Sequence, residues 1–381
     1  MADEINVLVV DDSALMRKMI SSMIEGSRDL KVCDTAMNGK IALEKIQTRN
    51  PDIIVLDLEM PEMNGIEFLR ERRKRGITIP VIILSSIAEK GATVTMEALS
   101  LGASDFVQKP SGSISVDIAT VKDHVVELLQ AYGSKYRRFN KKPATGSAPA
   151  AAGTTASAKP ASLTSQLSSL GFGAVKKAAP IVPVRSPGKI EVVALGISTG
   201  GPDALRVVFS RLEPTVKVPI LVVQHMPPGF TLEFARSLDK ICALDVSEAV
   251  DGEEIVGGHI YIAQGAKHLE VERQGTKVVA RLTSSPQVSG HRPSADVLFG
   301  SVALAYTNHV LGVIMTGMGK DGASQLGTIY REGGLTIGQD EATAVVYGMP
   351  RVAFEMGHVM EQVALENMGK RISQITALSH L

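Results

Sequence analysis

A low-complexity segment near the middle divides this chain of 381 residues into two parts. Over residues 143–165, every position except Lys159 and Leu163 is Pro, Ala, Gly, Ser or Thr. Such a segment buries too little apolar surface to offset the conformational entropy that folding removes. The sequence therefore predicts a flexible linker over residues 138–188, which separates a domain at 1–137 from a second domain at 189–381.

Both flanking parts alternate short apolar runs with amphipathic helical segments. In the first such segment, Leu15, Met19 and Met23 recur at spacings of four, which places them on one helical face. Continuous apolar strands that alternate with helices are typical of a doubly wound parallel sheet. We therefore expect two α/β domains, the first flavodoxin-like and the second Rossmann-like with an added β-hairpin. Strands are predicted at 5–10, 31–36, 52–58, 80–86 and 105–109, then at 190–197, 218–225, 309–316 and 334–339, and the hairpin at 268–282 with its turn at Gln274 and Gly275.

Overall charge and hydropathy exclude several classes of partner. Lys and Arg together number 40, as do Asp and Glu, so the chain lacks the basic excess of a nucleic-acid-binding protein. No apolar run approaches the ~20 residues that a membrane helix needs, and the first residues lack the basic region of a secretory signal. Cys33 and Cys242 fall in different predicted domains, which argues against a disulfide. We expect a cytoplasmic protein that neither binds nucleic acid nor inserts into a membrane.

Charged side chains end several strands of the first predicted domain. Asp11 and Asp12 follow the first strand, Asp57 ends the third, and Ser85 and Lys109 end the last two. In an open parallel sheet, ligands collect at the carboxyl ends of the strands. Clustered carboxylates repel one another unless a cation neutralises them, and Mg²⁺ prefers such oxygen ligands. The sequence therefore predicts a Mg²⁺ site at the three aspartates, suited to transfer of a phosphoryl group onto Asp57.

Three short motifs in this domain strongly resemble the response-regulator receiver family. They are "VVDDS" at 9–13, "DLEMPEMNG" at 57–65 and "FVQKP" at 106–110, and the resemblance covers about residues 5–125. It implies that Asp57 accepts phosphate from a histidine kinase. It also implies that Ser85 and Phe106 report the phosphoryl group by moving.

Two glycine-rich loops in the second domain compete for the chemistry. "GISTGG" at 196–201 follows a predicted strand, opens a helix and matches G-x-S-x-G, the sharp turn that exposes a serine nucleophile. "TGMGKDGA" at 316–323 contains G-x-G-x-x-G, the pattern of a dinucleotide-binding loop. In the second loop, however, Asp321 lies where a pyrophosphate would meet the helix N-terminus. A nicotinamide-dependent oxidoreductase is therefore the weaker alternative.

A serine nucleophile needs a base, and that base needs a group to orient it. Ser198 and His225 each end a predicted strand, and Asp321 follows a third, so neighbouring strands would bring all three together. Pattern alone leaves His291 open as a second candidate for the base. No metal-ligand spacing is present, so we expect no cofactor in this domain. A receptor-binding switch without catalysis is a further alternative, which could dispense with these three residues.

Four motifs of the second domain closely resemble the catalytic domain of the chemotaxis protein-glutamate methylesterases, the CheB family. They are "GISTGGPDAL" (196–205), "VVQHMPPGFT" (222–231), "HRPSADVLF" (291–299) and "VIMTGMGKDGA" (313–323), and the match runs over about 190–375. The resemblance implies Ser198 as nucleophile, His225 as base and Asp321 as the acid that orients it. It places Thr199 and His291 near the site and makes the N–H of Met318 an oxyanion donor.

The same resemblance implies a substrate and a mode of control. The substrate would be a γ-glutamyl methyl ester or a glutamine on a methyl-accepting chemoreceptor, with methanol or ammonia released. A receiver tethered to an enzyme domain suggests a bistable arrangement. We expect the unphosphorylated receiver to pack over the catalytic face, and phosphorylation of Asp57 to weaken that packing.

Overall fold

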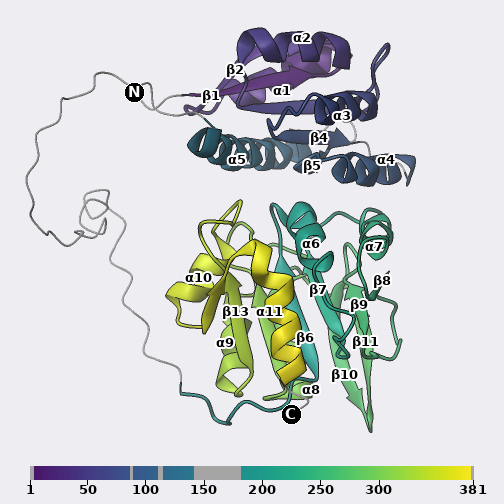
Figure 1. The fold of residues 1–381 in the computed structure, drawn as a ribbon, viewed down its shortest axis with the longest axis vertical. Helices are drawn as coiled ribbons and strands as arrows, with labels where there is room; N and C mark the ends of the chain where they lie inside the picture. The colour runs from purple at the N-terminus through teal and green to yellow at the C-terminus, as the bar shows by residue number, and fades with distance from the viewer. Residues whose placement is uncertain (1–3, 86–88, 110–114, 141–181, 379–381) are drawn as a thin grey trace, which may run out of the picture.

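Two α/β domains stack one on the other in the computed structural model, which describes residues 4–85, 89–109, 115–140 and 182–378 (Figure 1). Both main sheets are parallel, so the predicted fold class is confirmed. The predicted strands in both domains recur to within two residues at either end. Of the predicted linker, residues 141–181 lie outside the described residues.

The first domain is a five-stranded sheet in the order β2-β1-β3-β4-β5, with helices on both faces. Side chains begin two of the helices. Ser13 caps the first by accepting the N–H of Met16 at 3.3 Å, and Asn64 forms a capping box with Glu67 at the third. The elements are β1 (Ile5–Val10), α1 (Ala14–Glu25), β2 (Leu30–Ala36), α2 (Gly39–Arg49), β3 (Ile53–Asp57), α3 (Gly65–Lys74), β4 (Val81–Ser85), α4 (Glu89–Ser100), β5 (Asp105–Gln108) and α5 (Ser115–Asn140).

The second domain has a seven-stranded sheet in the order β14-β13-β12-β6-β7-β9-β8 and a separate antiparallel hairpin. Sequence reasoning missed the short strands β8, β9 and β14, of three or four residues each. The hairpin turns at Gly275 and Thr276, one residue later than predicted. The elements are β6 (Val192–Ile197), α6 (Gly201–Phe209), β7 (Ile220–Gln224), α7 (Thr231–Asp239), β8 (Asp245–Glu248), β9 (His259–Ile262), β10 (His268–Gln274), β11 (Lys277–Thr283), α8 (Ala295–Tyr306), β12 (Val310–Ile314), α9 (Ala323–Arg331), β13 (Leu335–Gln339), α10 (Met349–Glu355), β14 (Glu361–Val363) and α11 (Leu365–Leu378).

Both ends of the predicted linker carry ordered structure. Helix α5 continues to Asn140, three residues past the expected domain boundary. At the other end, the N–H of Val184 donates to the carbonyl of Arg331 at 2.8 Å, and that of Gly188 donates to Asn308 at 3.0 Å. These backbone bonds fasten residues 184–188 to the second domain before β6 begins.

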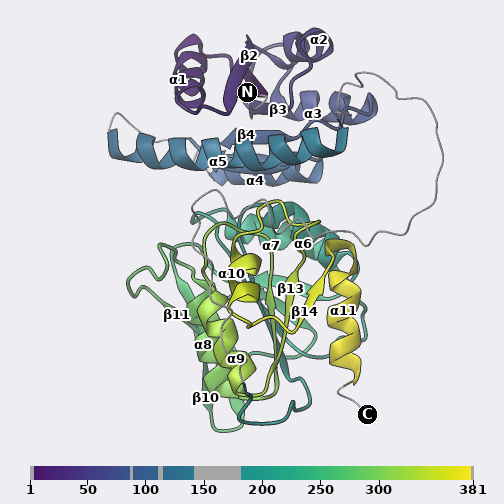
Figure 2. The same cartoon turned by 90° about the vertical axis from the view of Figure 1, so that its left-hand side faces the viewer.

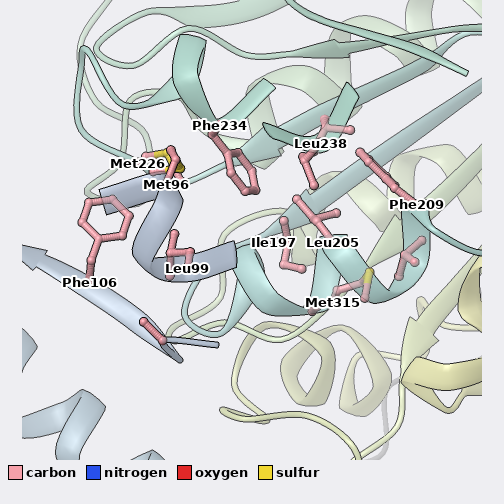
Figure 3. Close-up of a cluster of buried hydrophobic side chains, with 14 of the residues drawn as sticks. Met96, Leu99, Phe106, Ile197, Leu205, Phe209, Met226, Phe234, Leu238 and Met315 are labelled. Carbon is pink, nitrogen blue, oxygen red and sulfur yellow. The ribbon is translucent and has the colours of Figure 1, made fainter. Parts of the chain in front are cut away.

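The first domain sits on the second through α4, β5 and α5 (Figures 1 and 2). Helix α4 packs on α7, and the ring of Phe106 on β5 stacks on Phe230 with centroids 4.8 Å apart. Figure 3 shows Met96 and Leu99 of α4 in one buried cluster with Met226 and other apolar side chains of the second domain. One continuous apolar core therefore crosses the boundary between the domains.

Candidate functional site

Three neighbouring strands bring Ser198, His225 and Asp321 to one edge of the second sheet. Ser198 follows β6 and His225 follows β7, while Asp321 lies in the loop after β12; β6 pairs with both β7 and β12. His225 Nδ1 lies 3.0 Å from Ser198 Oγ, and His225 Nε2 lies 2.7 Å from Asp321 Oδ2. The three side chains therefore form a continuous hydrogen-bonded chain from hydroxyl to imidazole to carboxylate.

Asp321 is held by donors from the start of α8. Its Oδ1 accepts from Ser294 Oγ at 2.6 Å and its Oδ2 from the N–H of Ala295 at 2.7 Å. Burial alone would raise the pKa of Asp321, but the hydrogen bonds from His225, Ser294 and Ala295 outweigh burial and hold that pKa below its usual value. An ionised Asp321 accepts the Nε2 proton of His225, which leaves the Nδ1 lone pair facing Ser198.

His291 lies against the ring of His225 and away from the hydroxyl. The two imidazoles stack with centroids 3.7 Å apart and an angle of 14° between their planes. Burial, and then the neighbouring His225, lower the pKa of His291 to about 4. His291 is therefore neutral near pH 7 and supports one face of the imidazole that contacts Ser198.

Close backbone packing fixes the position of Ser198. Its N–H donates to the carbonyl of Thr316 at 2.9 Å, and Gly200, two residues on, adopts φ 81°. A Cβ added to Gly317 would lie 2.8 Å from Ser198 Cβ, so only glycine permits this approach. Met318, the predicted oxyanion donor, follows Gly317 directly in this loop and lines a neighbouring cavity.

Both domains line the cavity in front of Ser198. Its volume is about 360 Å³. The second-domain wall includes Thr199, which the sequence placed near the site, and the opposite wall comes from β5 and α5. A helix of the first domain therefore covers the entrance to the hydrogen-bonded triad. The lining includes Ser198, Thr199, His225, His291 and Arg292 from the second domain and Asp105, Phe106, Val121 and His124 from the first.

A second cluster of charges lies at the carboxyl edge of the first sheet. Ligand oxygens of Asp11, Asp12 and Asp57 lie within 4.8 Å of one another. Lys109 Nζ lies 3.2 Å from Asp11 and 2.9 Å from Asp57. Burial raises the pKa of Asp57 even though Lys109 opposes this. One ammonium against three carboxylates leaves an excess of negative charge on oxygen ligands, a donor set that fits Mg²⁺.

Ser85 and Phe106, the two remaining residues predicted near this cluster, lie on the paired strands β4 and β5. Ser85 Oγ lies 2.6 Å from Thr95 Oγ1, and Phe106 is buried between the domains. Sequence reasoning missed Thr95, Ser294 and Asp105. Ser294 had a usable signal, since a serine directly before an apolar helical run is typical of a helix N-cap. Nothing in the sequence marked Asp105, whose partner belongs to the other domain.

Together these features define a class of protein, a response regulator in which a receiver domain is joined to an α/β output domain that carries a serine, histidine and aspartate in hydrogen-bonding distance. Residues 7–118 match the response regulator receiver domain and residues 193–372 match the CheB methylesterase family. Two full-length relatives are named protein-glutamate methylesterase/protein-glutamine glutaminase. The one from Treponema denticola is 53% identical over 98% of both chains, and the one from Treponema pallidum is 46% identical over 98% of this chain and 97% of its own.

The chain belongs to the CheB methylesterase family. Among solved structures, the catalytic domain of Thermotoga maritima CheB is 38% identical and covers 49% of this chain and 98% of its own, with a TM-score of 0.48. None of the helices in the described parts of the chain is both long and apolar enough to span a membrane.

Proposed function

We propose that this chain hydrolyses γ-glutamyl methyl esters on chemoreceptors, and deamidates glutamines at such positions, under control of its receiver domain. Its two Treponema relatives, which are named protein-glutamate methylesterase/protein-glutamine glutaminase, support this proposal. The observation that carries it is the Ser198–His225–Asp321 chain at 3.0 and 2.7 Å.

In the proposed first step, Ser198 Oγ attacks the ester carbonyl and gives its proton to His225 Nδ1. Asp321 stabilises the imidazolium that forms through its bond to Nε2. The N–H of Met318 donates to the oxyanion of the tetrahedral intermediate. Loss of one such donor typically costs about 100- to 1,000-fold in kcat.

In the proposed second step, the C–O bond to the methoxy group breaks and His225 returns its proton to the departing oxygen, which releases methanol. Water then attacks the acyl-enzyme with His225 as base, and this gives a glutamate carboxylate and restores the Ser198 hydroxyl. A glutamine follows the same path with ammonia as the leaving group. The amide is the poorer substrate because its nitrogen leaves less readily.

Control would start at Asp57. Its carboxylate takes a phosphoryl group from a phosphohistidine of the chemotaxis kinase, and the imidazole of the kinase leaves. Asp11, Asp12 and Asp57 would hold Mg²⁺, which when bound neutralises charge that builds up on the transferred phosphoryl oxygens. Lys109 would bind a further phosphoryl oxygen, while Ser85 and Phe106 would respond by moving. The covered cavity in front of Ser198 supports inhibition by the unphosphorylated receiver.

The alternatives have less support. Asp321 lies within the G-x-G-x-x-G loop, and its carboxylate accepts hydrogen bonds from His225 and from the start of α8. A pyrophosphate bound at this loop would be repelled by that carboxylate. A non-catalytic switch has no need for a serine, histidine and aspartate in hydrogen-bonding distance. The free thiols Cys33 and Cys242 support a location in the reducing cytoplasm.

The decisive experiment measures methanol release from methyl-esterified receptor, with and without acetyl phosphate and Mg²⁺. The wild-type chain should release methanol, and the phosphodonor should raise the rate. Ser198→Ala should abolish release while thermal unfolding stays unchanged. Full activity of Ser198→Ala would exclude the proposed nucleophile.

A further inference from the structure

Helix α5 of the receiver lies along the face of the catalytic domain that carries the triad (Figure 2). Val121 and His124 line the cavity in front of Ser198. Further along, Lys135 Nζ donates to the carbonyl of Thr343 at 2.8 Å. From Val121 to Lys135 a helix rises about 21 Å. The catalytic domain therefore holds a helix across its active-site face over roughly four turns.

Between these two contacts, Glu127 of α5 faces a second cavity of about 760 Å³. His291 and Met318 line the same cavity, so it adjoins the triad and the proposed oxyanion donor. Glu127 Oε1 is buried and has no hydrogen-bond donor among the residues that the structure describes. Burial raises the pKa of Glu127 to about 7. The receiver thus presents a partly protonated glutamyl side chain, on a helix, in the cavity next to the triad.

We propose that the groove under α5 is the binding site for the receptor segment that carries the modified glutamate, and that this segment binds there as a helix in place of α5. The groove is defined by its catalytic-domain wall: His291, Met318, Lys320, Tyr347 and Arg351. The inference rests on the proposed function, because it takes the substrate to be a glutamyl side chain of a protein. Helix α5 then inhibits by occupying the substrate's own contacts, with Glu127 in the role of a glutamyl side chain.

The charge of the groove favours an acidic occupant. Lys320 forms no ion pair within the described part of the chain, and Arg351 approaches only Glu355 of its own helix, at 3.7 Å. Each turnover converts a neutral ester or amide into a carboxylate, so a segment with several such sites becomes more acidic. Exposed cations along the groove would attract that segment and fix its register.

The first test reverses one charge of the groove in the full chain. Arg351→Glu is suitable because Arg351 lies on α10, whereas Lys320 directly precedes Asp321. With acetyl phosphate and Mg²⁺ present, kcat/KM is measured for methyl-esterified receptor and for p-nitrophenyl acetate. We expect Arg351→Glu to lower the receptor value at least tenfold more than the small-ester value, mainly through KM. The matched control, Arg331→Glu at the end of α9, should change both values by the same factor. An unchanged ratio in Arg351→Glu would overturn the proposal.

The second test is independent of catalysis. The photo-cross-linking residue p-benzoylphenylalanine replaces Tyr347, and the cross-linked peptides are mapped. Without a phosphodonor the captured peptide should come from α5, and with acetyl phosphate and receptor it should come from the receptor. The same residue at position 331 should capture neither. Receptor that is demethylated but never captured from position 347 would show that it binds elsewhere.

Different results would contradict the proposed function and the proposed receptor-binding groove. If the proposed nucleophile is wrong, Ser198→Ala keeps its methanol release whichever surface is cross-linked. If only the groove is wrong, Ser198→Ala is inactive and position 347 still fails to capture receptor.

Discussion

Asp105 of the receiver accepts a hydrogen bond from the backbone N–H of Gly200, two residues after Ser198, at 2.9 Å. Gly200 is the N-cap of α6, so the carboxylate lies at the positive end of that helix. Asp105 is buried and also lies 3.4 Å from the hydroxyl of Tyr132. The receiver is therefore bonded to the same loop that presents Ser198.

Removal of this carboxylate should release the receiver. Asp105→Ala leaves the buried N–H of Gly200 without its acceptor in the docked state. Such an unsatisfied donor costs about 1–3 kcal/mol, which is roughly 5- to 150-fold in a docking equilibrium. We expect Asp105→Ala to raise methanol release in the absence of a phosphodonor and to leave the phosphorylated rate nearly unchanged. Asp29→Ala, on an exposed turn of the receiver, is the matched control. Basal activity equal to wild type would mean that this bond does not contribute to inhibition.

Docking should also depend on pH through Asp105. Burial raises the pKa of Asp105 from 3.8 to about 6. A pKa that is higher in the docked state means that protonation favours docking, so this contribution is present in acid and is lost as the pH rises through about 6. Energy transfer between dyes on the two domains should therefore report more docked protein at pH 5.5 than at pH 8.

Other groups at the interface titrate as well, among them Asp203, whose pKa burial raises. Burial raises the pKa of Glu127, which acts in the same direction, and desolvation lowers that of His124, which acts in the opposite direction. The contribution of Asp105 is isolated by Asp105→Asn, in which the slope between pH 5.5 and pH 8 should become smaller. An identical slope in Asp105→Asn would assign the pH dependence to the other interface groups.

The donors around Asp321 should set the rate of the chemical step. Asp321→Asn disrupts the tautomer that points the Nδ1 lone pair at Ser198, and similar changes in serine hydrolases cost roughly 10⁴-fold in kcat. Ser294→Ala removes only one donor, at 2.6 Å, so we expect about a tenfold loss that Ser294→Thr restores. Burst kinetics with p-nitrophenyl acetate measure both. A normal acylation rate in Asp321→Asn would exclude Asp321 as the orienting acid.

Chelation of Mg²⁺ should affect the receiver site at Asp57 and leave hydrolysis at Ser198 unchanged. Mg²⁺ is expected only at the receiver aspartates, so EDTA should abolish stimulation by acetyl phosphate without changing unstimulated hydrolysis of a small ester. Asp57→Asn should give the same pattern in the presence of Mg²⁺. Stimulation that survives in Asp57→Asn would place the phosphoryl group on another residue.

The sequence predicted those parts of the molecule that depend on strand order alone. Ser198 and His225 each follow a buried parallel strand directly, and Asp321 lies in the loop after a third. Because parallel strands end at one edge of the sheet, the grouping of these three residues followed from local pattern. The short strands β8 and β14 were missed because they carry few apolar residues and lie at the edges of the sheet.

Other features depend on geometry that a pattern does not carry. The sequence patterns around His225 and His291 were similar, so they did not decide which of the two is the base. Only the structure shows that His225 contacts the Ser198 hydroxyl and that His291 stacks on the ring of His225. The contact between Asp105 and Gly200 joins two domains and residues 95 positions apart, so no local pattern predicts it. In the sequence, Glu127 cannot be told from any other charged residue on a helix.

Asp105, Phe106 and Lys109 lie within five consecutive residues at strand β5, about 13 Å from first to last in an extended chain. Lys109, which contacts Asp57, is therefore joined to the two residues that contact the second domain by one strand, hydrogen-bonded along β4. If a phosphoryl group on Asp57 displaces Lys109, we expect that displacement to pass along β5 to Asp105 and the loop of Ser198. The path between the proposed phosphorylation site and the proposed nucleophile loop would then cross five residues of a single strand.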